Sequence, residues 1–293
     1  MAKNPLQVFP PSSLNSPDLM PPLSDFGHRF LAEGDSWFTL GTLNPLKNAN
    51  LLFALAFTQR AVAINCATPG DTLQHMAEFG RDPNFAALLA GVTQRPWDAL
   101  LLSCGGNDLI DALQVPPDGG HPPELRLLRR ADEWGDAAQG AARYLSEAGW
   151  QTFAGYVQQS LEAILALRDR GASRGAPAFL HGYALPTPRP APAGPKMGPW
   201  LLPPLQAYGI PPADHAALAA LLIGKLGTLL AACAADGARF PNLHFFDTAA
   251  IAIEPAAPGS TGESGDWINE IHLTRAGCRK LAGPWSAAIE AVL

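Results

Sequence analysis

Three segments of the sequence carry residue types that together could perform nucleophilic catalysis. Ser36 follows an acidic residue in "FLAEGDSW", directly after an apolar run. Asn107 follows two glycines in "SCGGNDL", and His272 lies near the end of the chain in "DWINEIHLTRAG". A serine hydroxyl is a weak nucleophile unless an adjacent base, usually histidine, activates it and a third group orients that base. The residue types therefore suggest Ser36 as a nucleophile and His272 as its general base.

Acyl transfer by such a serine also needs fixed donors for the oxyanion that develops on the substrate. The backbone N–H groups of Ser36 and Gly70 could serve, Gly70 being the glycine of "ATPGDTL". Asn107 could add its side-chain amide as a third donor. The neighbouring glycines would let the backbone approach the reacting carbon closely.

Each of these features also has a purely structural explanation. Ser36 could be an ordinary helix N-cap, because serine and aspartate accept hydrogen bonds from free backbone N–H groups. Pro69-Gly70 could be a simple turn, and a lone histidine such as His272 is usually a surface residue. The elements that would position these residues must decide between the two interpretations.

Short apolar runs alternate with helical patterns along the chain. Nearly continuous hydrophobicity is typical of parallel strands covered on both faces. The expected strands are Arg29–Glu33, Ala61–Cys66, Ala99–Cys104, Ala178–His181 and Leu243–Phe246. The expected helices are Asn50–Gln59, Asn84–Gln94, Gly140–Arg170, Ala213–Ala235 and Thr274–Val292. This alternation predicts a doubly wound α/β fold, in which ligands bind at the carboxyl ends of the strands.

The candidate residues all follow such strand ends or precede the last helix, and their order is specific. Gly34-Asp35-Ser36, Gly70, Gly106-Asn107-Asp108 and the His272 segment resemble the four signature blocks of the SGNH hydrolases, also called GDSL-type esterases and lipases. The resemblance spans about residues 30 to 277. It implies a three-layer α/β/α, flavodoxin-like fold with a five-stranded parallel sheet, and neither cofactor nor metal. It also implies Ser36 as nucleophile, His272 as general base, and Ser36, Gly70 and Asn107 as the oxyanion hole.

The histidine block departs from the usual family pattern of Asp-x-x-His-Pro. Here Asn269 stands at the aspartate position. Asparagine can orient an imidazole, as in Cys-His-Asn enzymes, but it brings no negative charge. We prefer Asn269 as the orienting residue, with slower turnover than a full triad would give. Three nearby carboxylates remain alternative helpers, namely Asp247, Asp266 and Glu270, and for Asp35 we favour a role in supporting the turn.

The segment 182–212 is rich in proline and glycine yet keeps large apolar side chains, including Trp200 and Tyr208. A disordered linker would be poorer in such groups. The segment could be a lid over a substrate pocket or a flap packed on the surface. Trp37 could line the same pocket or simply pack in the interior.

Composition sets the remaining limits. The formal charge of −6 with no basic run argues against nucleic acid as a partner. The four widely spaced cysteines predict free thiols. The N-terminal segment carries prolines where a signal peptide needs an apolar region, and no apolar run reaches the roughly 20 residues of a membrane span. We therefore expect neither of these segments, and we expect a cytoplasmic protein. We divide the chain into an N-terminal extension, 1–27, and a hydrolase domain, 28–293.

These observations favour an ester hydrolase that acts on a small-molecule ester through an acyl-enzyme. A second interpretation, motivated by Asn269, is a binding or accessory protein that keeps the fold with weakened chemistry. A flavin or nucleotide binder is disfavoured because "GDSWFTLGTL" is not a phosphate-binding loop. A metallohydrolase using Asp35, Asn107 and His272 would lack the further ligands of a two-metal site. The sequence does not set the oligomeric state or the substrate.

Overall fold

A computed structural model describes residues 3–16, 18–39, 49–78, 80–81 and 83–293. Within these residues the chain builds one parallel sheet of six strands in the order β2-β5-β3-β6-β7-β8. Its strands are β2 (Gln7–Phe9), β3 (His28–Gly34), β5 (Ala61–Asn65), β6 (Ala99–Ser103), β7 (Ala178–His181) and β8 (Leu243–Phe246). A small antiparallel pair joins β1 (Asn4–Pro5) to β4 (Ala56–Phe57).

Helices connect the strands and cover the sheet. The α-helices are α1 (Ser36–Thr39), α2 (Leu51–Ala54), α3 (Leu73–Ala77), α4 (Pro83–Ala90), α5 (Gly106–Leu113), α6 (Glu147–Arg170), α7 (Leu202–Ala207), α8 (His215–Ala235) and α9 (Arg275–Glu290). Short 3₁₀ helices span Pro11–Asn15, Leu23–Asp25, Pro123–Leu125, Ala131–Glu133, Ala137–Tyr144 and Pro212–Asp214.

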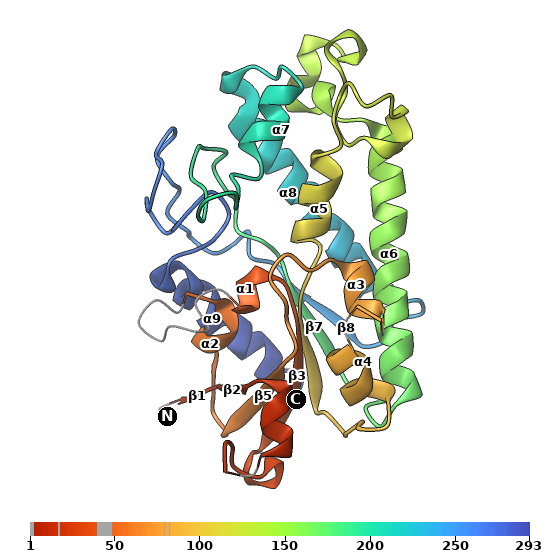
Figure 1. Cartoon of the computed structure of the whole chain (residues 1–293), viewed down its shortest axis with the longest axis vertical. Coiled ribbons are helices and arrows are strands. Elements are labelled where there is room, and N and C mark those ends of the chain that lie inside the picture. The colour runs from red at the N-terminus through yellow and green to blue at the C-terminus, as the bar shows by residue number, and fades with distance from the viewer. Residues whose placement is uncertain (1–2, 17, 40–48, 79, 82) are drawn as a thin grey trace.

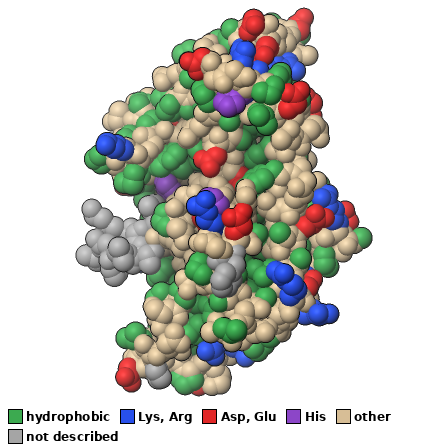
Figure 2. Space-filling model, turned by 45° about the vertical axis from the view of Figure 1, so that its right-hand side comes forward, with side chains coloured by type: hydrophobic (Ala, Val, Ile, Leu, Met, Phe, Trp, Pro, Cys, Tyr) green, Lys and Arg blue, Asp and Glu red, His purple; other side chains and the backbone are tan. Residues whose placement is uncertain are grey.

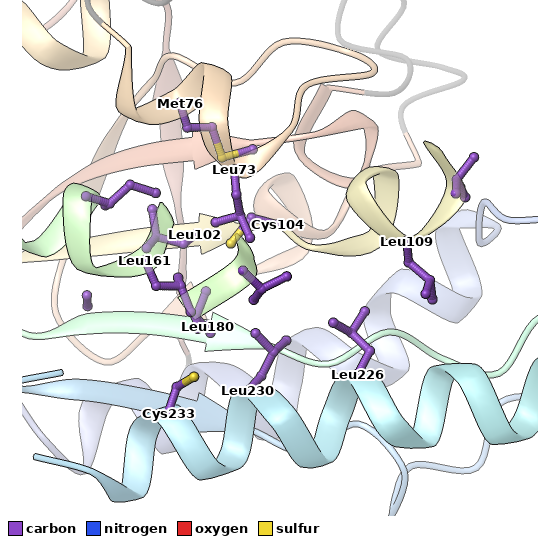
Figure 3. Close-up of a cluster of buried hydrophobic side chains, with 14 of the residues drawn as sticks. Leu73, Met76, Leu102, Cys104, Leu109, Leu161, Leu180, Leu226, Leu230 and Cys233 are labelled. Atoms are coloured by element: carbon purple, nitrogen blue, oxygen red, sulfur yellow. The ribbon is translucent and has the colours of Figure 1, made fainter. Parts of the chain in front are cut away.

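The three layers follow from the alternation of side chains along the strands. Phe30 and Ala32 of β3 join one apolar cluster with α2 and α9, whereas Leu31 joins another with α3, α4, α6 and α8. Figure 1 shows α2 and α9 on one side of the sheet and α3, α4 and α6 on the other. In Figure 3 side chains of α3, α6 and α8 meet Leu102 of β6 and Leu180 of β7. Both faces of the sheet are therefore buried, and the predicted α/β/α layering is confirmed.

The sheet differs from the prediction in its number of strands. All five predicted strands are present within one residue of the expected bounds, but β2 adds a sixth, pairing in parallel with β5 from Gln7↔Val62 to Phe9↔Ile64. The strand lies in the segment 1–27, of which residues 1–2 and 17 are outside the described part. The pattern "QVF" is too short to predict a strand on its own, and β2 is recognisable as a strand only because it pairs with β5.

Three predicted helices differ from the structure by four residues or more at one end. The helix expected over Asn84–Gln94 ends at Ala90. In the segment expected as a helix over Asn50–Gln59, only α2 is helical, and the chain then becomes extended in β4. The helix expected over Gly140–Arg170 begins at Glu147, where the Ser146 side chain accepts a hydrogen bond from Gly149 N. Gly140 itself has φ +56°, which interrupts the preceding 3₁₀ turns.

Helix α8 is unusually apolar for a helix on the outside of a sheet. Among the described residues, Pro212–Ala235 is the one helical stretch whose length and mean hydropathy (2.0) would suit a membrane span, with 39% of it buried. A core helix of an α/β domain has the same composition, so this is weak evidence for a membrane. Its leucines 218, 222, 226 and 230 pack in the core. The four cysteines are free and buried, as predicted.

On the face drawn in Figure 2, Lys and Arg side chains lie beside Asp and Glu side chains, so the positive charges on this face do not form a continuous basic surface.

The order of the strands indicates at which edge of the sheet a ligand would bind. The chain passes from β3 to β5 on one side and then to β6 on the other. At such a switch point the connecting loops diverge and leave a crevice beyond the carboxyl end of the first strand. Ser36 lies directly beyond β3.

Candidate active site

The turn that carries Ser36 is held tightly against the neighbouring strand. An added Cβ at Gly34 would come within 2.7 Å of the Cβ and carbonyl oxygen of Ser103, so this position needs glycine. Asp35 N donates to Ser103 O at 3.0 Å, and α1 begins at the next residue. The close contact between β3 and β6 therefore fixes where the serine leaves the sheet.

His272 lies beside Ser36, although the two residues are 236 positions apart in the sequence. The distance between His272 Nε2 and Ser36 Oγ is 2.6 Å. On the other side of the ring, His272 Nδ1 lies 3.0 Å from Asn269 Oδ1. The same oxygen accepts hydrogen bonds from the backbone N–H of Ile271 and His272, which identifies it as the amide oxygen. Nδ1 must then carry the proton, and Nε2 is free to accept the proton of Ser36.

The imidazole is neutral in this environment. His272 is buried, and desolvation lowers its pKa from 6.5 to about 4. Trp200 covers the ring edge-on, with ring centroids 5.4 Å apart. Burial disfavours the charged form of a histidine unless an anion lies close. Because Asn269 is neutral, it orients the ring without offsetting this cost.

Two of the carboxylates considered as helpers of His272 serve other local structures. The Asp266 carboxylate accepts from Lys280 Nζ at 2.5 Å and from Glu254 N at 2.6 Å. Asp247 is exposed, and its carboxylate accepts from Ala249 N at 2.8 Å. The hydrogen bonds of both carboxylates thus go to residues other than His272.

Glu270 hydrogen-bonds to the segment 182–212. Its carboxylate is completely buried and accepts hydrogen bonds from the backbone N–H groups of Arg189, Trp200, Leu201 and Leu202. The last three donors are the first residue of α7, its N-cap Leu201, and the residue before that cap. Burial raises the pKa of this carboxyl even though four donors stabilise its charged form. Glu270 thus ties the proline-rich segment to the loop that carries His272.

Asp35 supports the turn, as its position suggested. Its carboxylate accepts from Trp37 N at 2.9 Å, Ser103 Oγ at 2.8 Å and Tyr183 Oη at 2.6 Å. Burial nevertheless raises its pKa to about 6. Asp35 therefore connects the turn after β3 with β6 and with the segment after β7. Its side chain also lines a cavity beside Ser36.

The two remaining oxyanion candidates are held together by the first turn of α5. Gly70 has φ +82°, a conformation that favours glycine. Asn107 Nδ2 donates to Asp71 O at 2.9 Å, directly beside Gly70. The next residue, Asp108, accepts from Leu73 N at 3.0 Å and from Tyr156 Oη at 2.5 Å. One amide hydrogen of Asn107 therefore positions the Gly70 loop, which leaves the other for a ligand.

A cavity opens at the serine. Its walls come from the turn after β3, the first turns of α5, the segment after β7, and α8. Among the proposed pocket residues Trp37 lines it, whereas Trp200 contacts His272 and Tyr208 lies elsewhere. Tyr208 is buried and donates to Val115 O at 2.7 Å, beside a second depression formed with Pro116 and Pro199. The lining residues from segment 182–212 are Tyr183, Ala184, Pro186 and Leu201, so this segment forms part of the wall.

Sequence reasoning did not find several residues on which this arrangement depends. Ser103 and Tyr183 hold Asp35, and Asp108 holds the Gly70 loop. Arg189 is buried and donates to Ser260 O, Ser260 Oγ, Gly262 O and Asn269 O. Asp108 directly follows Asn107 and could have been noticed there. The other contacts join residues far apart in sequence, and no local pattern indicates them.

Among the residues that the structure describes, no three His, Cys, Asp or Glu side chains converge as metal ligands would. Models of known protein families give no match to this sequence, and neither do the curated proteins.

Several solved structures are similar in outline. A phospholipase A1 from Streptomyces albidoflavus NA297 has 14% sequence identity and a TM-score of 0.49, covering 89% of this chain and 98% of that one. A carbohydrate acetylesterase from Sinorhizobium meliloti has 11% identity and a TM-score of 0.41, covering 91% and 100%. An aryl esterase from M. smegmatis has 12% identity and a TM-score of 0.40, covering 91% and 100%. A likeness at this level does not assign an activity, which must be argued from the site.

Proposed function

We propose that this chain is a serine ester hydrolase of the SGNH type, acting on a small-molecule ester through an acyl-enzyme on Ser36. The observation that carries the proposal is the relay of contacts Ser36 Oγ to His272 Nε2, 2.6 Å, and His272 Nδ1 to Asn269 Oδ1, 3.0 Å. A nucleophile, a base and an orienting group in this order are what acyl transfer requires. The relay lies at the switch point of the sheet and opens into a cavity.

In the acylation step, His272 Nε2 takes the proton of Ser36 as Oγ attacks the ester carbonyl. The negative charge that develops on the carbonyl oxygen is stabilised by the backbone N–H groups of Ser36 and Gly70 and by the Asn107 amide. His272 then returns the proton to the departing alcohol. A water molecule repeats the sequence on the acyl-enzyme, which releases the acid and restores Ser36.

Because Asn269 is neutral, it limits the rate of this reaction. It holds the Nδ1–H tautomer in place through its Oδ1, which keeps Nε2 directed at Ser36. It contributes no charge to the imidazolium that forms in each step. The barrier is therefore higher than with a carboxylate at this position, and turnover is slower.

The proposal is tested by hydrolysis of p-nitrophenyl esters from acetate to decanoate by the wild type, Ser36→Ala and His272→Ala. Both variants should lose at least about a thousandfold in kcat/KM, because the nucleophile and base act as a unit. Ser24→Ala, at an exposed serine away from the cavity, is the matched control and should keep full activity. Covalent labelling by a fluorophosphonate should follow the same pattern.

Equal rates in the wild type and Ser36→Ala, or the absence of both hydrolysis and labelling, would contradict the proposal. The chain would then fit better as a binding protein with this fold, the alternative that Asn269 suggested.

A further inference from the structure

The cavity at Ser36 is too small for more than a short acyl group. Its volume is about 40 Å³, room for only a few atoms beyond the reacting carbonyl. Sites for drug-sized ligands typically measure roughly 300–1,000 Å³. A substrate with a longer acyl chain must therefore extend beyond this cavity.

A larger groove, of about 740 Å³, adjoins the cavity between α8 and the segment that follows β8. Three residues line both spaces, namely Tyr183, Ala184 and Ile223. The small side chain of Ala184 lies between them. The cavity and the groove are thus direct neighbours, with these three residues at their boundary.

The floor of the groove is made by the side of α8 that does not pack on the sheet. Leu226 and Leu230 point from α8 into the core (Figure 3), which places Gly224, Gly227 and Ala231 on another side of the helix. Because these residues are small, the helix surface is hollow there. The opposite wall carries Phe245, Ile251 and Ile253. Asp247 is the one charged residue in the described lining, and its carboxylate is engaged by Ala249 N.

We propose that this groove binds the acyl chain of a medium- or long-chain ester whose carbonyl lies at Ser36. The inference rests on the proposed hydrolase function and adds the substrate class. A linear hydrocarbon chain fits the lining, which offers apolar contacts and few polar partners. Each methylene that becomes buried should improve kcat/KM by about fourfold until the groove is filled. The chain enters the groove by passing between Ala184 and Ile223.

Gly224→Phe tests the groove without a cost to folding. An added Cβ at Gly224 meets no atom within 4 Å, and phenylalanine suits a helix interior better than glycine does. The aromatic ring would occupy the groove floor. Gly155→Phe in α6 is the matched control, because Gly155 also lies inside a long helix with free space around its Cβ and lines neither space.

The measurement is the ratio of kcat/KM for p-nitrophenyl decanoate to that for the acetate. In the wild type the ratio should exceed one hundred. Gly224→Phe should lower it at least tenfold, and Gly155→Phe should leave it unchanged. A wild type that prefers acetate, or a Gly224→Phe ratio equal to that of the wild type, would overturn the inference.

A binding experiment separates this inference from the hydrolase function. The Ser36→Ala protein is titrated calorimetrically with methyl octanoate, which needs no catalysis. Binding that weakens at least tenfold when Gly224→Phe is added supports the groove, even if the wild type hydrolyses no ester. Absence of binding, or equal binding by both proteins, overturns the acyl-chain assignment and leaves the groove as a surface for another partner.

Discussion

At the scale of single residues, the amide oxygen of Asn269 takes the position in which a carboxylate would stabilise a charged imidazole. It accepts from His272 Nδ1 and from the backbone N–H groups of Ile271 and His272. Asn269 therefore orients the His272 ring without supplying a negative charge. The ring is oriented by a residue that leaves its pKa at about 4, far below that of a free histidine.

Asn269→Asp should restore the missing charge and shift the pH dependence of catalysis. In the wild type, protonation of His272 should lower kcat/KM only near pH 4, because the base becomes protonated only there. An adjacent carboxylate favours imidazolium, so the variant should lose activity nearer pH 6. Its kcat at pH 8 should rise by about tenfold. Initial rates across pH 3.5–9 with p-nitrophenyl acetate measure both effects.

The comparison between the two profiles also controls for Asp35. Burial raises the pKa of Asp35 to about 6, so this carboxyl titrates in the same range and acts on both proteins alike. The difference between the profiles therefore reports on His272. Identical acid limbs would mean that residue 269 does not face the base during the reaction.

The sequence indicated the candidate catalytic residues better than the residues that hold them in place. Ser36, Asn107 and His272 lie in short motifs with glycines or helix caps nearby, and the structure brings Ser36 and His272 into contact. The partners of Asp35, namely Ser103 and Tyr183, come from two other strand ends. Nothing in a local pattern marks a buried serine or tyrosine as such a partner, because the contact exists only after the sheet has formed.

At the scale of elements, the segment 182–212 is fixed by buried polar contacts and not by packing alone. Glu270 accepts from Arg189 N and from the backbone N–H groups of residues 200–202, and Arg189 donates to the carbonyl of Asn269. These contacts join the wall of the cavity to the loop that carries His272. Disturbing them should therefore affect both stability and catalysis.

Glu270→Gln tests this connection with a nearly isosteric change. One side-chain oxygen becomes an NH₂ group that faces backbone N–H donors, so buried donors lose their acceptor. The free energy of unfolding should fall by about 1–3 kcal/mol, and limited proteolysis should cut within 186–202 sooner. Urea denaturation and timed digestion measure these effects. Glu263→Gln, at an exposed glutamate, is the control and should change neither.

If Glu270→Gln were as stable and as resistant to protease as the wild type, the segment would be held mainly by its apolar side chains. The surface-flap interpretation of the sequence would then describe it better.

Helix boundaries show where local patterns lose their information. The apolar periodicity that predicted a helix from Gly140 continues through a stretch in which Leu145 is extended and forms a bridge with Leu128. The true start depends on the Ser146 cap, whose hydroxyl accepts from Gly149 N and donates to Pro123 O. Contacts with a loop more than 20 residues away thus decided the boundary. The cap of α9 is local, because the Thr274 hydroxyl accepts from Gly277 N only three residues along the chain.

At the scale of the whole molecule, the first residues of the chain complete the sheet. The other five strands were predictable because each contains a short, mostly apolar run. Strand β2 is short and half-buried, and its neighbour β5 lies far away in the sequence. The predicted division at residue 28 places this short strand in the N-terminal extension, because no local pattern marks its pairing with β5.

Removal of residues 1–10 should therefore destabilise the domain. The deletion takes away the buried side chain of Leu6 and the half-buried β2, and it leaves the apolar edge of β5, Val62 and Ile64, without a covering strand. Burying one leucine contributes about 1.5–3 kcal/mol, so the free energy of unfolding should fall by at least that much. The open strand edge should also promote aggregation. Urea denaturation and light scattering at 25 °C measure the two effects.

Removal of the exposed Val292 and Leu293 is the control and should change neither the free energy of unfolding nor the aggregation. A shortened protein as stable and soluble as the full chain would show instead that the first ten residues are an extension on which the domain does not depend.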